Sequence, residues 1–89
     1  MKIGYTVETV FLFAESPEEE YHVEKPHWCL TMHEAYTKAD ELRDTYMKTL
    51  GNPYPIYAFN RYCGNGTVKF IKIRLSKFGK CFLEQVICQ

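Results

Sequence analysis

The N-terminal segment alternates between apolar and polar residues. From Ile3 to Phe13 the odd positions carry mainly large apolar side chains, whereas Thr6 and Glu8 occupy even positions. A period of two residues is typical of a strand with one face on a core. The pattern predicts a strand over residues 3–13 whose odd-numbered side chains point inward.

An acidic segment interrupts this alternation. Ser16-Pro17-Glu18-Glu19-Glu20 combines a proline, which has no N–H to donate to a strand ladder, with three adjacent like charges. We expect an exposed acidic loop here. Residues 21–24 are predicted to form a short extended piece, because Lys25 precedes Pro26 and is therefore biased away from helical dihedral angles.

The middle of the chain carries the signature of one amphipathic helix. In Thr31-Met32-His33-Glu34 the hydroxyl and the carboxylate have the spacing of a capping box, which satisfies free backbone N–H groups at a helix start. Gly51 followed by Pro53 is a stop signal. The periodicity predicts a helix over 32–49. Its inward residues are expected to be Tyr36, Ala39, Leu42 and Tyr46.

The C-terminal part is predicted to be a series of antiparallel strands. Residues 54–63 and 67–77 are strand-like and flank Gly64-Asn65-Gly66, which is a strong hairpin signal. A further strand, Cys81 to Cys88, follows the turn at residues 77–80. The expected fold class is α+β: a single domain over residues 1–89, with one helix packed on a mainly antiparallel sheet in the order β-α-β-β-β.

The register of the predicted hairpin determines which residues share a face. A two-residue turn at Asn65-Gly66 would place Ile56, Ala58 and Asn60 opposite Leu75, Ile73 and Ile71, on the face toward the helix. The other face would carry three aromatic–cation pairs: Tyr57 with Arg74, Phe59 with Lys72, and Arg61 with Phe70. A three-residue loop would shift the register by one residue and scatter these pairs.

Composition and charge support a small folded domain with two electrostatic halves. The 89 residues are 46% hydrophobic and 16% aromatic, which is enough apolar surface for one core. The net charge is zero, yet residues 1–50 hold five Lys/Arg and ten Asp/Glu, whereas residues 51–89 hold six and one. Two readings stay open: two faces of opposite sign that could meet a macromolecule, or two halves that attract each other within the fold.

The cysteines and the termini bear on the cellular compartment. The first residues lack the apolar stretch and cleavage site of a secretory signal, and no run reaches membrane-spanning length. We therefore expect a cytoplasmic protein with no membrane contact. In that reducing compartment, Cys29, Cys63, Cys81 and Cys88 are predicted to be thiols in or near the core rather than disulfides.

Histidine, cysteine and glutamate residues are the candidates for metal binding and catalysis in this sequence. His27-Trp28-Cys29 and His33 could bind zinc if a second cysteine approached, but the spacing is not that of a zinc finger and no Cys-x-x-Cys pair exists. A Cys29–His nucleophilic pair lacks an orienting third group. The solvated run at 18–20 cannot split the pKa values of its carboxylates as acid–base catalysis requires. We expect no enzyme activity, no cofactor and no essential metal.

The predicted aromatic–cation face is the candidate binding site. Its residues are Tyr57, Phe59, Arg61, Phe70, Lys72 and Arg74. Rings interleaved with cations suit single-stranded nucleic acid, where bases stack and cations neutralise phosphate, and equally suit an acidic groove on a protein. The structural alternative is that aliphatic stems of neighbouring side chains cover the rings.

The order of the elements resembles a class of small inhibitors. A short extended segment, Thr31-Met32-His33-Glu34-Ala35 opening a helix, and antiparallel strands near the C-terminus are similar to small phage-encoded inhibitors. These include anti-CRISPR proteins and the phage inhibitor of bacterial RNA polymerase. The resemblance implies a non-catalytic protein that inhibits or modulates a larger, host macromolecular complex by covering its surface. The expected partner is thus a protein or nucleoprotein complex. The alternative function is a single-stranded nucleic-acid-binding module.

Overall fold

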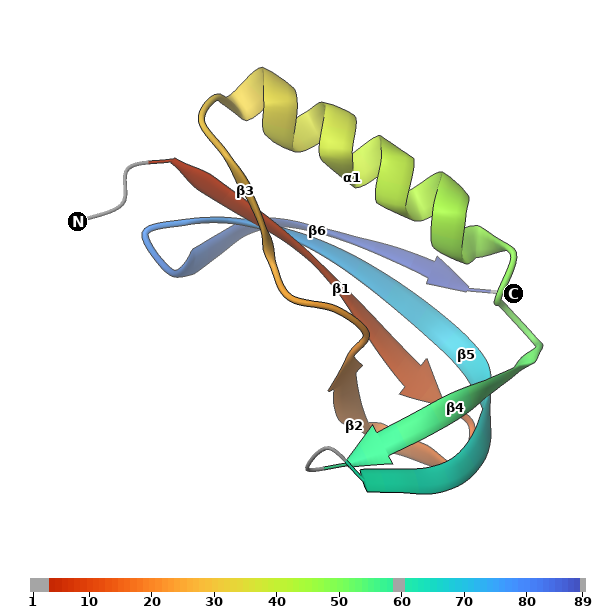
Figure 1. Ribbon diagram of the computed structural model, residues 1–89. Helices are drawn as coiled ribbons and strands as arrows, with labels where there is room; N and C mark the ends of the chain where they lie inside the picture. Colours follow the sequence, from red (N-terminus) through yellow and green to blue (C-terminus); the bar gives the residue numbers. More distant parts are fainter. Residues whose placement is uncertain (1–3, 59–60, 89) are drawn as a thin grey trace.

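The described part of the chain forms one helix and six strands. The computed structural model describes residues 4–58 and 61–88 (Figure 1). In chain order the elements are β1 (Tyr5–Phe13), β2 (Ser16–His22), β3 (His27–Cys29), α1 (Met32–Met47), β4 (Pro53–Ala58), β5 (Arg61–Lys77) and β6 (Lys80–Cys88). The helix lies across one face of the sheet, which confirms the α+β prediction. The observed order, β-β-β-α-β-β-β, has two more strands before the helix than predicted.

Two long strands, β1 and β5, form the centre of the sheet. They pair antiparallel from Tyr5↔Lys77 to Phe13↔Val68. The other edge of β1 is shared by β3, which pairs with its first half, and β2, which pairs with its second half. The other edge of β5 is likewise shared, because β4 pairs with its first half and β6 with its second half. Every pairing is antiparallel.

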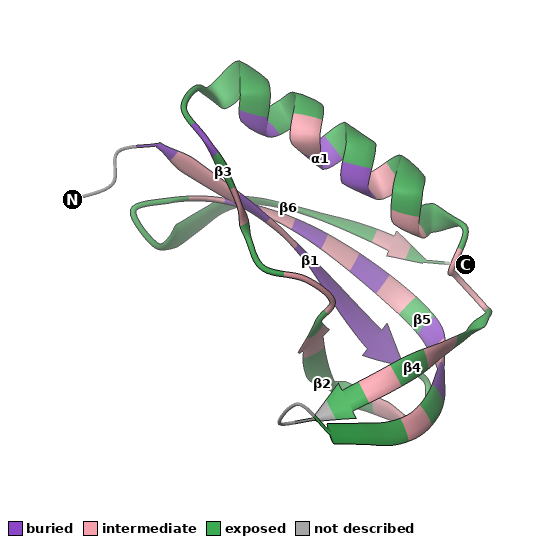
Figure 2. Ribbon diagram, in the orientation of Figure 1, coloured by how far each residue is buried: buried purple, intermediate pink, exposed green. Residues whose placement is uncertain are grey.

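The core lies between α1 and the helix-facing side of β1 and β5. Figure 2 shows buried residues concentrated on β1, along β5 and on the inner side of α1. The predicted inward positions of β1 are confirmed for Val7, Phe11 and Phe13, whereas Ile3 lies outside the described residues. Val10 is also buried, although it lies on the face away from the helix. Its neighbours there are His22 and Lys72, whose long side chains can shield it from solvent.

The helix begins as the capping-box pattern predicts. The backbone N–H of Glu34 donates to Thr31 Oγ1 at 3.1 Å, and the Glu34 carboxylate accepts from the backbone N–H of Leu30 at 3.0 Å. Ala35, Ala39 and Leu42 are buried, and Tyr46 packs on the core. The expectation for Tyr36 is wrong, since its side chain is 44% exposed. The buried positions recur at three- and four-residue spacing from position 35, and position 36 falls on the flank of that stripe.

The acidic segment is a strand and not the predicted loop. Ser16–His22 forms β2 and pairs with β1 through Phe13↔Ser16 and Phe11↔Tyr21. Proline is compatible with this position because β2 is an edge strand. The strand alternates its side chains, so Glu18 and Glu20 project on one face and Glu19 on the other. The adjacent charges are thereby separated, and Glu20 meets basic partners.

The predicted hairpin turn is also wrong. Gly64-Asn65-Gly66 lies inside β5, and β4 pairs with β5 through Pro53↔Thr67, Tyr54↔Gly66 and Pro55↔Asn65. Strand β4 ends at Ala58, which pairs with Arg61 at the start of β5, and Phe59 and Asn60 lie outside the described residues. The predicted partners of Leu75, Ile73 and Ile71 on β4 are replaced by Val7, Thr9 and Phe11 of β1.

Gly64 and Gly66 allow β5 to bend. The register shifts by one residue between Pro55↔Asn65 and Tyr57↔Tyr62, and Gly64 in this stretch has a φ of +109°. Glycine adopts such an angle without the strain that a side chain would bring. At Gly66 a Cβ atom would lie 2.6 Å from carbons of Phe13 and Ile56. These glycines therefore allow a bulge and a close approach within β5, and they do not form a turn.

The last hairpin forms at the place that the sequence predicts. Lys77 pairs with Lys80, so Phe78 and Gly79 are the two turn residues. Both have positive φ, +53° and +77°, as a type I′ turn requires. The predicted strand at 81–88 is confirmed as β6.

We expect Gly66→Ala to destabilise the fold by about 1–3 kcal/mol, because the added methyl group would overlap Phe13 and Ile56. The measurement is the free energy of unfolding in urea. Asn65→Ala, at an exposed neighbouring position, is the control and should change it by less than about 0.5 kcal/mol. Equal stabilities of the two variants would contradict the close approach at Gly66.

Candidate functional site

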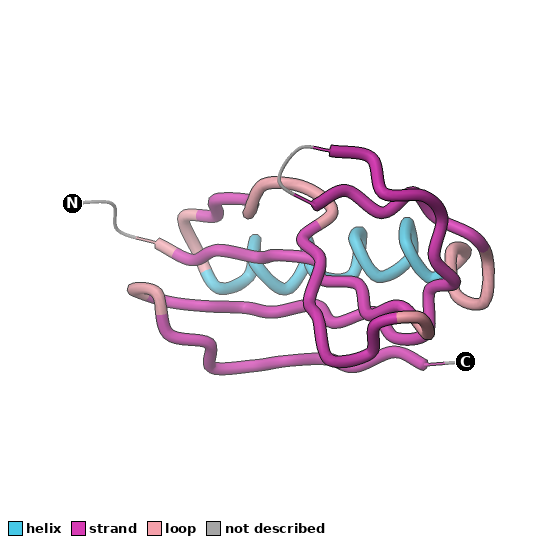
Figure 3. Tube along the Cα trace, turned by 90° about the horizontal axis from the view of Figure 1, so that it is seen from below, coloured by secondary structure: helices cyan, strands magenta, loops and turns pink. Residues whose placement is uncertain are grey.

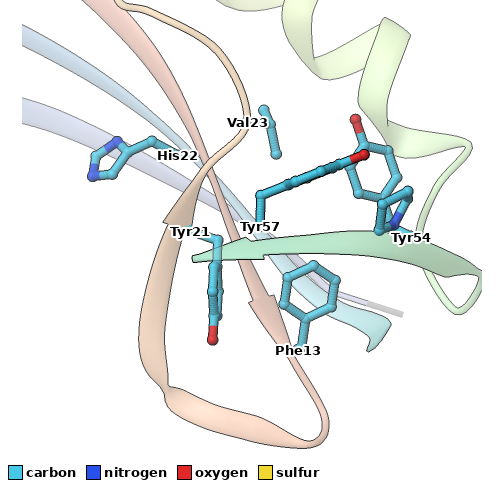
Figure 4. Close-up of a pocket in the computed structure, with 7 residues that line it drawn as sticks. Phe13, Tyr21, His22, Val23, Tyr54 and Tyr57 are labelled. Carbon is cyan, nitrogen blue, oxygen red and sulfur yellow. The ribbon is translucent and has the colours of Figure 1, made fainter. Parts of the chain in front are cut away.

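An aromatic groove opens between β2 and β4. Its volume is about 270 Å³ (Figure 4). The residues that line it are Phe13, Tyr21, His22, Val23, Tyr54, Pro55 and Tyr57. Figure 4 shows that the side chains of Val23 and Tyr57 approach each other across the groove, whereas the imidazole of His22 points away from the rings. We call this site the aromatic groove.

The floor of the aromatic groove is rigid and its rim is open. Phe13 is buried and makes an edge contact with Tyr21, with ring centroids 5.2 Å apart. Tyr54 makes a similar contact with the buried Phe11 at 4.9 Å. Tyr57, in contrast, is 60% exposed and has Tyr62 beside it at 5.6 Å. Edge-to-face packing holds the inner rings in place, which leaves the Tyr57 ring available to a ligand.

Backbone hydrogen bonds at residues 67 and 68 of β5 hold the two sides of the groove, β2 and β4, close to each other. Val68 pairs with Phe13 on one edge, and on the other edge it accepts from Gly51 N–H at 2.8 Å and donates to the carbonyl of Asn52 at 3.2 Å. The neighbouring Thr67 carbonyl accepts from the N–H of Ala14 in the β1–β2 turn at 2.9 Å. Because both the start of β4 and the turn before β2 are attached there, their strands lie on either side of Phe13.

Carboxylates flank the aromatic groove. The Tyr21 hydroxyl donates to Glu19 Oε2 at 2.6 Å, and this bond raises the pKa of the Tyr21 phenol. On the other side Glu24 lies 2.6 Å from His27 Nε2. Glu24 also affects Tyr46: burial, followed by the Glu24 charge, raises the pKa of Tyr46 to about 12. Each carboxylate therefore lies close to a residue that lines the groove, because Glu19 is bonded to Tyr21 and Glu24 follows Val23 in the chain.

The structure separates the six predicted binding residues. Tyr57 lines the aromatic groove, Arg61 is exposed opposite Ala58, and Phe59 lies outside the described residues. Lys72 and Arg74 belong to the second half of β5, on the face away from the helix. Phe70 shares that face. The aromatic–cation pairing is wrong, because β1 and β6, and not β4, flank these three residues.

On that face, Lys72 and Arg74 form a cluster with two carboxylates. Arg74 contacts Glu20 through both terminal nitrogens, one of them 2.9 Å from Oε1, and its Nε lies 2.5 Å from Glu84 Oε2. Lys72 Nζ lies 3.6 Å from Glu20 and 3.9 Å from Glu84. The bond from Arg74 lowers the pKa of Glu20, and Glu20 in turn raises the pKa of Arg74. The two cations are therefore largely compensated within the protein.

The sequence reading missed most of the aromatic groove. The sequence predicts Phe13 and Tyr54 in separate strands and Tyr21 in a short extended piece, and it does not bring the three rings together. The one available signal was the density of rings in Tyr54-Pro55-Ile56-Tyr57, where prolines exclude a central strand and favour an edge. That signal predicts an exposed aromatic strand, but it does not say that β2 lies opposite.

The histidine, cysteine and acidic side chains of the described residues do not form a metal site. Within residues 4–58 and 61–88, no group of three or more His, Cys, Asp or Glu side chains could hold a metal ion. The four cysteines are free thiols. Cys29 is buried, which raises its pKa, but Cys63, Cys81 and Cys88 are exposed, so their predicted place near the core is wrong. Among the described residues, the helix is too short and too polar to cross a membrane.

Comparison with known proteins does not add a relative. No protein family, no curated protein and no solved structure matches the chain. The function therefore has to be argued from the aromatic groove and its surroundings.

We predict that stability declines at alkaline pH through Tyr46. Its pKa is about 12 in the folded protein, whereas an unfolded tyrosine ionises near pH 10, so the folded state holds the proton more tightly. This contribution is complete below about pH 10 and is lost between about pH 10 and 12. The measurement is the urea midpoint at three pH values across this window. The midpoint of Tyr46→Phe should fall less steeply; an identical decline in both proteins would contradict the assignment.

A second prediction concerns the bond between Glu20 and Arg74. A double-mutant cycle with Glu20→Gln and Arg74→Met should give a coupling free energy of about 0.5–1 kcal/mol, since the pair is bidentate but partly exposed. The lowered pKa of Glu20 means that this coupling is present above about pH 4.5 and is lost as the pH falls and the carboxylate becomes protonated. A coupling of zero at neutral pH would show that the cluster is only a solvated contact.

Proposed function

We propose that this protein is a non-catalytic binding domain that inhibits or modulates a larger macromolecular complex by covering part of its surface. In this proposal the aromatic groove holds a basic segment of a partner protein. The single observation that carries the proposal is the exposed Tyr57 ring, which lines a groove whose inner rings, Phe13 and Tyr54, are held by edge-to-face contacts.

The chemistry of the groove favours a lysine or arginine side chain. A cation over a tyrosine ring is stabilised by about 0.5–2 kcal/mol, depending on how much water is excluded. The nearby carboxylates of Glu19, bonded to Tyr21, and of Glu24, next to Val23, add an attraction for the same charge and repel phosphate or an acidic peptide. The aliphatic part of a long basic side chain can pack on Val23 and Pro55, which line the groove.

The size of the groove favours a protein segment over a small molecule. Pockets for drug-sized ligands and cofactors typically have volumes of about 300–1,000 Å³, and this groove, at about 270 Å³, lies just below that range. Such a space suits one or two side chains of an extended segment, and the remaining contacts would come from the surrounding surface. Tyrosine is among the residues that contribute most to protein interfaces.

The charge cluster weighs against the nucleic-acid alternative. Lys72 and Arg74 are engaged by Glu20 and Glu84, so neither offers an uncompensated positive charge to phosphate. Among the predicted basic residues this leaves Arg61, close to Tyr62 in β5. Sequence-independent binding of nucleic acid depends mainly on phosphate neutralisation, which one exposed arginine supplies poorly.

A cytoplasmic location fits the same proposal. Three exposed thiols, Cys63, Cys81 and Cys88, would be prone to oxidation or exchange in an oxidising compartment, whereas a reducing one keeps them as thiols.

We propose to test the groove with defined probes. A peptide of nine residues with one central arginine, the same peptide with glutamate at that position, and an oligo-dT are titrated into isotope-labelled protein. The arginine peptide should shift the NMR signals of Val23, Tyr54 and Tyr57. Tyr57→Ala should weaken its binding about tenfold, as expected for an aromatic contact worth about 1.4 kcal/mol.

The matched control is Tyr36→Ala, which removes an exposed tyrosine of α1 that does not line the groove. It should leave binding of the arginine peptide unchanged. The proposal fails if the glutamate peptide binds equally well, or if Tyr57→Ala and Tyr36→Ala behave alike. Salt-sensitive binding of oligo-dT at Tyr57 and Arg61 would instead support the nucleic-acid function.

A further inference from the structure

The free edges of the sheet differ in how well they are protected. A free edge presents unpaired backbone groups, so a strand of another chain can pair with it. Proline, charged side chains or a short strand make such pairing less favourable. Strand β2 carries Pro17 and three glutamates, and β4 carries Pro53 and Pro55. Strand β3 is only three residues long. Three of the edges are therefore unsuited to pairing with another chain.

Strand β6 lacks these protective features. It runs for nine residues, Lys80–Cys88, without proline or glycine, and its charged residues are Lys80 at its start and Glu84. Among the described residues it pairs only with β5. Leu83 is 42% exposed and Val86 is 51% exposed. The edge therefore combines a long row of available backbone groups with exposed apolar side chains.

The helix does not protect the apolar side chains of β6. The main contacts of α1 are with β1, β3 and β5. Figure 3 shows β6 at the border of the sheet, beyond the strands in front of the helix. Leu83 and Ile87 lie opposite Leu75 and Ile71, so they project on the helix side of the sheet, where Ile87 packs against the core and Leu83 stays exposed.

We propose that two copies of this chain pair through β6 as antiparallel edge strands, with Gln85 opposite Gln85 of the partner subunit. The two sheets would then form one continuous sheet around a two-fold axis. Such an interface is isologous, because each β6 strand supplies both the donor row and the acceptor row.

The side chains select this register. With Gln85 at the centre, the exposed Leu83 lies opposite the partly buried Ile87 of the partner subunit on the helix side, and the pairing covers Leu83. On the other face Glu84 lies opposite Val86 of the partner subunit. A register centred on Glu84 would place two carboxylates directly opposite each other, which destabilises an antiparallel pair. The charge pattern therefore favours the Gln85 register.

Residue Val86 allows a test that separates dimerisation from folding. Within one chain Val86 lies beside Lys72 of β5, so Val86→Glu gains a favourable neighbour and should leave the fold intact. In the proposed dimer the new carboxylate faces Glu84 of the partner subunit, and symmetry repeats this repulsion. Val86→Lys reverses the sign and faces the same glutamate favourably, but within one chain it lies opposite Lys72, so its folding is compared with that of the wild type.

The experiment is sedimentation equilibrium of the reduced full chain from micromolar to millimolar concentration, with circular dichroism to check folding. The wild type should associate to a dimer. Val86→Glu should raise the dimer dissociation constant about tenfold, from two like-charge pairs, whereas Val86→Lys should not raise it. Leu30→Glu introduces the same charge at an exposed position before the helix and serves as the control.

Three outcomes would overturn the proposal. A wild type that stays monomeric at millimolar concentration excludes the dimer. Equal weakening by Val86→Glu and Val86→Lys excludes the Gln85 register, and equal weakening by Val86→Glu and Leu30→Glu excludes β6 as the interface. Since Val86 lies on the face opposite the aromatic groove, these results are independent of peptide binding by Tyr57.

Discussion

The antiparallel pairing of β1 with β5 is the interaction on which the rest of the structure depends. It joins residues 5–13 to residues 68–77 and aligns Val7, Phe11, Ile71 and Ile73 on one face, where α1 covers them. It also occupies one edge of each central strand. The other four strands therefore pair with the outer edge of β1 or of β5. The positions of the aromatic groove, the charge cluster and the free edges all follow from this arrangement.

The bend in β5 separates two regions with different chemistry. Before Val68 the strand pairs with β4 and curves toward β2, which creates the aromatic groove on the helix side. After Val68 it lies flat between β1 and β6, and its alternate side chains build the charge cluster on the opposite face. Glycines at 64 and 66 permit the transition. One strand thus holds β4 in place at the aromatic groove and carries an internally compensated charge cluster.

The zero net charge is in part the result of contacts between the two halves of the chain. Glu20 from the acidic half meets Lys72 and Arg74 from the basic half across β1, and Glu84 completes the cluster. Of the two readings that the sequence left open, attraction within the fold accounts for these residues. Glu19 and Glu24 take no part in this cluster, because they are bonded to Tyr21 and His27.

The sequence by itself determined the local elements whose signals lie within a few residues: the capped helix, the alternation of β1, the turn at Phe78-Gly79 and the strand after it. It could not determine which strand lies beside β5. Gly64-Asn65-Gly66 has the local chemistry of a turn, yet the burial of Phe13 and Ile56 against Gly66 requires an extended backbone there. Likewise, Glu20 becomes compatible with a strand only when Arg74, distant in sequence, lies across the sheet. Long-range pairing decided these points because burial of a shared core outweighs local turn preference and the repulsion between solvated charges.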